Sequence, residues 1–170
     1  MSRTEIVLIN PKSATNVGGV MRAAGCYGVE KVHYTGNRYG HAQKFATDTK
    51  QRVEEIPLTA LTDINTLVKS DTKIIAVELI DGATPLPHFT HPDNAIYVLG
   101  PEDGSIRKDV LKYCDDVVYI PTKGCMNLAA TVNVVLYDRL AKASNTDYSR
   151  EFLLENRDNN NKVSFNKNKN

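Results

Sequence analysis

Short apolar runs constrain the fold of this 170-residue chain more than any other feature of its sequence. Five of them span residues 5–9 (EIVLI), 31–34 (KVHY), 73–79 (KIIAVEL), 95–99 (AIYVL) and 116–120 (DVVYI), and all but the second contain two or more β-branched residues. The third and fourth runs are continuously apolar, which is typical of strands in a parallel sheet that helices cover on both faces. The sequence therefore predicts a largely buried parallel sheet.

Segments with helical spacing lie between these runs. Val17, Val20, Met21, Ala24 and Tyr27 recur at the spacing of one helix face, which predicts a helix from residue 15 or 16 with a glycine C-cap at position 28. Further helices are expected at about 59–68, 106–113 and 126–143, with a weak helix or loop at 41–49 and a loop at 82–87. The βαβ alternation predicts one α/β domain with a mostly parallel sheet flanked by helices.

The composition changes after about residue 143. Residues 144–170 are rich in Asn, Lys, Arg, Asp and Glu, and they offer too little apolar surface to offset the entropy cost of ordering. We therefore expect a domain over residues 1–143 and a polar C-terminal tail over 144–170 that is largely mobile. Within the tail, Phe152, Leu153 and Leu154 can dock one helical turn onto the domain.

The bulk composition excludes several classes of protein. A formal net charge of +1 with 41% hydrophobic residues is not that of a uniformly basic nucleic-acid binder, so any RNA affinity would come from local patches. The three cysteines, Cys26, Cys114 and Cys125, are far apart and form no CxxC pair, which argues against disulfides and a zinc site. With no signal-like start and no long apolar run, we expect a cytoplasmic protein with neither a membrane span nor a metal.

Three joints between a strand and a loop combine glycine with polar side chains. They span residues 10–24, 98–106 and 120–139. The carboxyl ends of strands are where parallel α/β sheets place their sites. The glycines match neither the dinucleotide fingerprint GxGxxG nor the phosphate loop GxxxxGK[ST], so the usual nucleotide-binding folds lose support.

In order and spacing, these joints resemble the three motifs of the SpoU (TrmH-like) branch of the SPOUT RNA methyltransferases, over residues 4 to 142. The matching residues of the first motif are Asn16, Gly18, Gly19 and Arg22. Those of the second are Gly100, Pro101, Glu102 and Gly104. Those of the third are Ile120, Pro121, Cys125, Met126, Asn127, Tyr137 and Asp138.

The resemblance implies a SPOUT fold with a deep C-terminal trefoil knot, and a homodimer that uses S-adenosylmethionine to methylate a ribose 2′-hydroxyl of tRNA or rRNA. The residues that it places around the cofactor are Leu79, Gly100, Ile120, Cys125, Met126 and Leu128. The residues that it places at the catalytic centre are Arg22, Asn16, Glu102 and Asn127.

The chemistry of methyl transfer agrees with this assignment. The methyl group of a sulfonium is already activated, so that positioning supplies most of the catalysis and no metal is required. A guanidinium is always protonated, so Arg22 is better suited to holding a phosphate and stabilising the developing alkoxide than to removing a proton. We expect Asn16 and Asn127 to orient Arg22 or the ribose, and Glu102 to fix Arg22 or the third-motif loop.

A basic segment with interleaved aromatic residues lies between residues 37 and 52. It suits contact with RNA phosphates together with stacking on an unpaired base. The residues expected to bind RNA are Arg38, Lys44, Lys50 and Arg52.

Two other functions fit parts of the sequence. Cys125 and Ala129 stand where many family members have serine, and the turn between Pro121 and Asn127 is short. These departures favour a noncatalytic RNA-binding or assembly factor that retains the SPOUT fold. A small-molecule methyltransferase is a third hypothesis, although it would leave the basic aromatic segment without a role.

Overall fold

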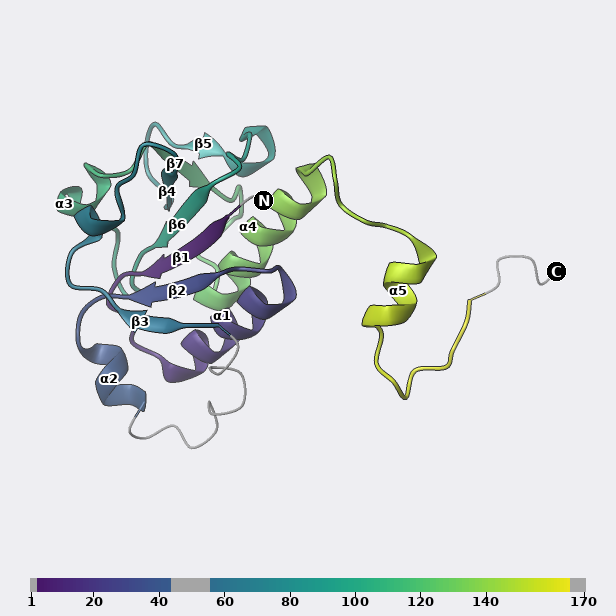
Figure 1. Ribbon diagram of the computed structural model, residues 1–170. Coiled ribbons are helices and arrows are strands. Elements are labelled where there is room, and N and C mark those ends of the chain that lie inside the picture. Colours follow the sequence, from purple (N-terminus) through teal and green to yellow (C-terminus); the bar gives the residue numbers. More distant parts are fainter. Residues whose placement is uncertain (1–2, 44–55, 166–170) are drawn as a thin grey trace.

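One parallel sheet organises the computed structural model, which describes residues 3–43 and 56–165 (Figure 1). In these residues, seven strands lie in the order β3-β2-β1-β6-β4-β7-β5, and each adjacent pair is parallel. The strands are β1 (Thr4–Leu8), β2 (Lys31–Tyr34), β3 (Leu58–Ala60), β4 (Lys73–Val77), β5 (Thr84–Pro85), β6 (Ala95–Leu99) and β7 (Asp116–Tyr119). The expected α/β fold with a mostly parallel sheet is confirmed.

Helices and two 3-10 turns make up the rest of the regular structure in residues 3–43 and 56–165. They are α1 (Ala14–Cys26), α2 (Arg38–Gln43), η1 (Ile64–Leu67), η2 (Leu86–His88), α3 (Lys108–Leu111), α4 (Leu128–Lys142) and α5 (Arg150–Asn156). Ser13 caps α1 by accepting from the backbone N of Asn16, and Gly28 follows the helix at a φ of +66°, which glycine adopts readily. The helix and glycine expected there are both present.

The core has two layers because successive side chains of a strand point to opposite faces. Ile6 and Leu8 of β1 pack under α1 and α4 in the larger cluster. Val7 points to the other face, where it packs in a smaller cluster with residues of η1 and of the loop before α3. Helices therefore cover both faces, as the continuous apolar runs predict.

The two long helices pack unusually close together. A Cβ atom built on Gly19 of α1 would lie 2.7 Å from the Cβ of Ala129 in α4. Only a residue without a side chain fits this approach, and the small residue at 129 faces it. This contact brings the N-terminal half of α1 beside the first turn of α4.

The prediction of a helix at 59–68 is wrong. Residues 58–60 form β3, which pairs in parallel with β2, and Asp63 then caps the short 3-10 helix η1. Pairing with the sheet edge satisfies backbone groups of this segment, an outcome that local spacing does not reveal. The loop expected at 82–87 also needs correction, because it contains the edge strand β5 and the start of η2.

Other boundaries shift by a few residues. α3 is one turn, Lys108–Leu111, within the expected 106–113. α2 begins at Arg38, before the expected start at 41, and most of the remainder of that expectation lies outside the described residues. The tail contains a capped helix, α5, and the extent of its mobility stays a prediction. Across residues 3–43 and 56–165, no helix combines the length and the apolar character that crossing a membrane requires.

Candidate active site

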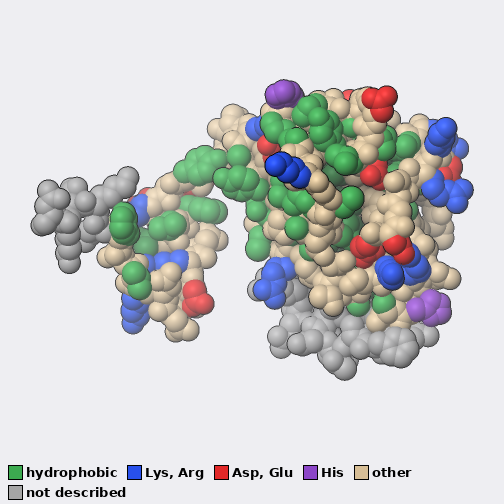
Figure 2. All heavy atoms as spheres, turned by 180° about the vertical axis from the view of Figure 1, so that it is seen from behind, with side chains coloured by type: hydrophobic (Ala, Val, Ile, Leu, Met, Phe, Trp, Pro, Cys, Tyr) green, Lys and Arg blue, Asp and Glu red, His purple; other side chains and the backbone are tan. Residues whose placement is uncertain are grey.

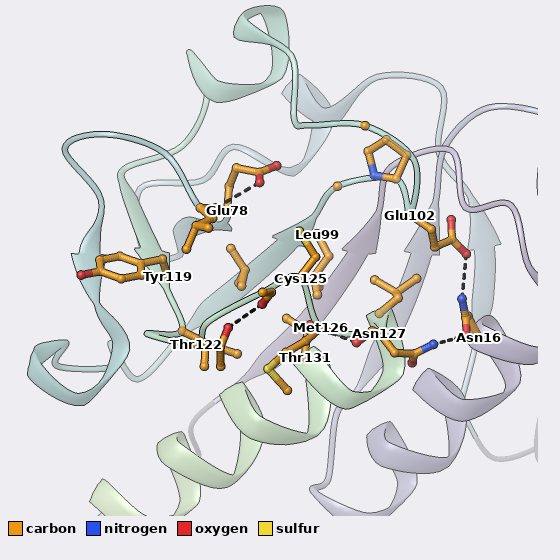
Figure 3. A pocket seen from close by; sticks show the side chains of 18 residues that line it. Asn16, Glu78, Leu99, Glu102, Tyr119, Thr122, Cys125, Met126, Asn127 and Thr131 are labelled. Carbon is orange, nitrogen blue, oxygen red and sulfur yellow. Dashed lines mark hydrogen bonds between the residues drawn. The ribbon is translucent and has the colours of Figure 1, made fainter.

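A pocket of about 420 Å³ opens at the carboxyl ends of β4, β6 and β7, beside the first turn of α4 (Figure 3). This volume lies within the range of about 300–1,000 Å³ that is usual for small-molecule sites. All six residues expected around the cofactor line the pocket: Leu79, Gly100, Ile120, Cys125, Met126 and Leu128. The side chains of Val77 and Leu99 also line it, and both are buried.

The third-motif loop, residues 120–127, forms one wall of the pocket. Its turn is held by the backbone N of Thr122 donating to Ile120 O at 2.8 Å, and by the Thr122 hydroxyl donating to Gly124 O at 2.7 Å. The loop ends at Asn127, whose Oδ1 accepts from the backbone N of Ala129 at 2.9 Å. This N-cap ties the end of the loop to the start of α4.

A chain of side-chain hydrogen bonds joins the three motifs. Asn127 Nδ2 donates to Asn16 Oδ1 at 2.8 Å, and Asn16 Nδ2 donates to Glu102 Oε1 at 3.1 Å (Figure 3). The α1 helix, the loop after β6 and the third-motif loop therefore meet through one continuous network. Three of the four residues expected at the catalytic centre belong to it.

Glu102 also holds the start of α1. Its carboxylate accepts from the backbone N of Lys12 at 2.8 Å and from that of Ser13 at 3.1 Å. Partial burial alone would raise the pKa of Glu102, but the hydrogen bonds from Lys12, Asn16 and Ser13 outweigh it and lower the pKa. We expected Glu102 to fix either Arg22 or the third-motif loop. In the structure Glu102 accepts from Asn16, which in turn accepts from Asn127 at the end of that loop.

Arg22, the fourth residue expected at the catalytic centre, does not line the pocket. It lies on α1, six residues beyond Asn16, which corresponds to roughly 9 Å along a helix axis. Its side chain is exposed. The structure therefore places Arg22 outside the pocket on the same helix as Asn16, where it faces solvent.

Glu78 is a pocket residue that sequence reasoning missed. It directly follows β4, and its carboxylate accepts from the backbone N of Leu79 at 3.0 Å and of Ile106 at 2.9 Å. A Cβ on Gly100 would lie 3.1 Å from Glu78 Oε2, so a larger residue at 100 would press on this carboxylate. The available signal was an acid close to the end of the apolar run at 73–79.

Arg38, expected to bind RNA, contacts protein groups. Its guanidinium donates to both carboxylate oxygens of Asp103 at 2.9 Å, and to the carbonyl oxygen of Asn10 at 3.0 and 2.6 Å. The bond from Arg38 lowers the pKa of Asp103. Arg38 thus joins the loops that follow β1 and β6. The other three residues expected to bind RNA, Lys44, Lys50 and Arg52, lie outside the described residues.

The cysteines differ in their surroundings. Cys125 lines the pocket and is exposed. Cys26 on α1 is also exposed but does not line the pocket. Burial raises the pKa of the Cys114 thiol to about 11, so this residue carries little thiolate at neutral pH. In the part of the chain that the structure describes, no group of His, Cys, Asp and Glu side chains is arranged to hold a metal ion.

Comparison with known proteins decides the family. The model of the SpoU rRNA Methylase family matches residues 3–137, which include the pocket and every motif residue except Asp138. The chain belongs to this family. Among the curated SpoU-family relatives, the 23S rRNA (guanosine-2′-O-)-methyltransferase RlmB of Acinetobacter baylyi is 26% identical over 132 residues. That alignment covers 72% of this chain and 53% of RlmB, so the chain spans about half the length of this relative.

Solved structures share the SpoU-family fold. A structure concerned with 2-OH methylation of C/U34 on tRNA has a TM-score of 0.69 at 20% identity, covering 83% of this chain and 91% of that one. The AdoMet-bound rRNA methyltransferase of Sinorhizobium meliloti has a TM-score of 0.70 at 16% identity, covering 83% of this chain and 57% of that one. At these identities the likeness establishes the fold.

Proposed function

We propose that this SpoU-family protein transfers a methyl group from S-adenosylmethionine to a ribose 2′-hydroxyl of tRNA or rRNA. The observation that carries the proposal is the convergence of all three motifs on one pocket, joined there by the chain from Asn127 through Asn16 to Glu102. Family membership supports it, as does RlmB, whose name gives a guanosine 2′-O-methyltransferase acting on 23S rRNA. RNA would thus be the partner.

The pocket suits the proposed cofactor. Its apolar wall around Val77, Leu99 and Leu128 fits an adenine ring, and the backbone groups of the third-motif loop can hydrogen-bond the edge of that ring. Two carboxylates, Glu78 and Glu102, give the pocket negative charge toward a ligand that carries a sulfonium and an ammonium group. When bound, S-adenosylmethionine supplies an electrophilic methyl group.

The side chains around the pocket serve mainly to position the reactants. Through its bond to Asn127, Asn16 holds the third-motif loop at a fixed distance from α1, the helix that carries Arg22. Arg22 would bind a backbone phosphate of the RNA and stabilise the alkoxide that develops on the 2′-oxygen. Because its guanidinium stays protonated, a phosphate oxygen or water would take the hydroxyl proton.

We also propose that the protein acts as a homodimer in the cytoplasm. The catalytic domain would recognise RNA with its own surface, and two copies would double that surface. The first and last helices of the domain, α1 and α4, lie side by side and offer a common face for the second copy. The trefoil knot and the boundary at residue 143 stay predictions.

In vitro methylation tests the reaction. Fractionated total RNA would be incubated with the protein and labelled S-adenosylmethionine, and its nucleosides would be analysed by mass spectrometry. The expected product is a 2′-O-methylated nucleoside that disappears with Arg22→Ala but not with Arg107→Ala, which changes another exposed arginine that does not line the pocket. A methylated base, or full activity of Arg22→Ala, would contradict the catalytic assignment.

Calorimetry with S-adenosylmethionine separates the proposal from its main alternative. The enzyme should bind the cofactor with a stoichiometry of one per chain. A chain that binds RNA and fails to bind the cofactor at millimolar concentration would instead be a noncatalytic RNA-binding factor. Methylation unaffected by competing bulk tRNA would point to a small-molecule substrate.

A further inference from the structure

Exposed apolar side chains gather near the C-terminus of the described chain. Among the large hydrophobic residues with the greatest exposure, most lie between residues 137 and 165. They are Tyr137, Leu140, Tyr148, Phe152, Leu153, Val163 and Phe165. This segment begins where the family match ends, so that the family's own pocket does not account for it.

The helix α5 presents two of these residues, Phe152 and Leu153, on one face. Ser149, Phe152, Leu153 and Asn156 recur at the spacing of neighbours on a helix, and all four line a cleft between α5 and the domain. Phe152 is 47% exposed and Leu153 is 64% exposed. A helix of seven residues is too short to persist alone in water, so α5 requires a surface to pack against.

The position of α5 away from the domain is set by its linker (Figure 1). The Thr146 hydroxyl donates to the carbonyl oxygen of Leu140 at 2.7 Å, which fixes the turn after α4. Asp147 Oδ1 then accepts from the backbone N of Ser149 at 2.8 Å, and Ser149 Oγ caps α5 by accepting from the backbone N of Phe152. We call residues 144–165 the C-terminal arm.

The cleft beneath the arm is larger than is usual for a small-molecule site. Its volume is about 1,480 Å³, against a usual upper value of about 1,000 Å³ for ligand pockets. Leu136 and Leu140 of α4 and Phe152 and Leu153 of α5 give it apolar walls. Figure 2 shows hydrophobic side chains on the arm and where the arm joins the domain.

The charge of the arm argues against an anionic partner. It carries four acids, Asp147, Glu151, Glu155 and Asp158, and three bases, Arg150, Arg157 and Lys162. RNA and acidic membranes attract surfaces with a clear excess of positive charge. A nearly neutral arm with one apolar face fits a protein surface instead.

We propose that the C-terminal arm clasps a second copy of this chain, with Phe152 and Leu153 packed against the partner. The inference rests on the homodimer of the proposed function and adds the segment that secures it. The arm starts at the end of α4, where Tyr137 and Leu140 are exposed. Tyr27 at the end of α1 and Leu140 of α4 line the same cleft as the arm, which therefore borders the face proposed for the second copy. Twofold symmetry would give each copy one arm and one surface that receives it.

Analytical ultracentrifugation over a dilution series tests the clasp. Phe152→Asp combined with Leu153→Asp should weaken the dimer at least about tenfold, because buried apolar anchors carry much of an interface's affinity. The matched control is Glu151→Gln combined with Glu155→Gln, which changes residues of the same helix that do not line the cleft and should leave the dissociation constant within about twofold. Equal dissociation constants for all three proteins would overturn the clasp and leave the dimer standing. A full-length chain that stays monomeric would overturn both.

Photo-crosslinking identifies what the arm touches. A copy with a benzophenone amino acid at position 152 is mixed with a copy carrying a mass tag, and the adducts are weighed. The clasp predicts an adduct of the two copies, which should be absent when the probe is at position 155. An adduct confined to one chain would show that the arm closes on its own domain, and an adduct with added tRNA would show that it binds RNA. Either result would overturn the proposal.

Discussion

At the scale of single residues, Asn127 uses both ends of one amide group. Its oxygen caps α4, and its nitrogen donates to Asn16 in the network that ends at Glu102. Serine can replace the first function, because serine and asparagine are comparable N-caps, but its hydroxyl stands one bond closer to the backbone than Asn127 Nδ2 and should fall short of Asn16. The two functions can therefore be separated by one substitution.

Asn127→Ser should lower the free energy of unfolding by no more than about 0.5–1.5 kcal/mol, the value of the lost bond to Asn16, since the cap is retained. The proposed methylation rate should fall by about two- to tenfold, which corresponds to the loss of one hydrogen bond of about 0.5–1.5 kcal/mol. Urea unfolding and a methylation assay measure the two quantities. Asn133→Ser on the same helix, outside the pocket, is the control, and equal activities of the two variants would contradict the role of the network.

The cysteines allow a test of the pocket that does not depend on turnover. With iodoacetamide at neutral pH, Cys26 and Cys125 should be alkylated, whereas Cys114 should react at least about tenfold more slowly because its pKa is raised to about 11. Saturating S-adenosylmethionine should protect Cys125 and leave Cys26 unchanged. Peptide mass spectrometry measures the extent of alkylation at each cysteine. If the cofactor did not slow the alkylation of Cys125, its site would lie elsewhere.

How far the site could be predicted differs from residue to residue. The cofactor wall was predicted through the family resemblance, and the fold brings its residues together because Gly100 follows one apolar run and Ile120 ends another in the same parallel sheet. Glu78 was not, because a single acid after a strand acquires its role only when β4 lies beside β6 and faces the backbone of Ile106. Likewise, the partner of Arg38 depends on a loop 65 residues away, which no local pattern indicates.

At the scale of elements, the contact between α1 and α4 fixes how the first and third motifs face each other. Gly19 permits this contact because a side chain there would overlap Ala129. The hydrogen bond between Asn16 and Asn127 links the same two helices near their N-terminal ends. Packing and hydrogen bonding therefore set one geometry together.

Gly19→Ala should destabilise the protein by about 1–3 kcal/mol, since the added methyl group forces the helices apart. This loss should outweigh the gain of up to about 1 kcal/mol that alanine brings to a helix. Gly25→Ala makes the same change in the same helix, where the nearest atom would be Ile56 Cδ1 at 3.9 Å, and should stabilise or leave stability unchanged. Thermal unfolding compares the variants, and similar melting temperatures would refute the packing argument.

Elements were predictable to the extent that local sequence decides them. The strands at 31–34 and 95–99 coincide with their apolar runs, because these runs are buried in the sheet. Residues 59–68 have helical spacing but begin as β3, since the free edge of β2 offers backbone partners to Leu58 and Thr59. Such pairing depends on tertiary structure and is invisible to periodicity.

At the scale of the whole molecule, Glu102 couples stability to pH. It joins the loop after β6 to the start of α1, and its pKa in the folded protein is lowered below the ordinary value of 4.5. A carboxyl group with a lowered folded pKa contributes stability above its unfolded pKa, and this contribution is lost as the pH falls through the folded pKa.

Glu102→Gln should therefore lower the free energy of unfolding at pH 7, by about 1 kcal/mol or less because the group is largely exposed. The difference from the parent should shrink as the pH falls below 4.5, where the parent's own carboxyl group becomes protonated. Denaturant titrations from pH 3 to pH 7 would show this convergence. Glu155→Gln on α5 controls for the general effect of removing a charge, and a difference that does not vary with pH would contradict the role of the carboxylate.

The position of β1 between β2 and β6 has a consequence for biosynthesis. β1 pairs with β6 across roughly ninety residues of chain, from Thr4 to Ala95, so one edge of β1 lacks its neighbour until the ribosome has made most of the domain. Contacts of such high sequence separation form slowly. The nascent chain would therefore expose the apolar faces of β1 and α1 during translation, and chaperones that bind such surfaces would encounter it before its sheet can close.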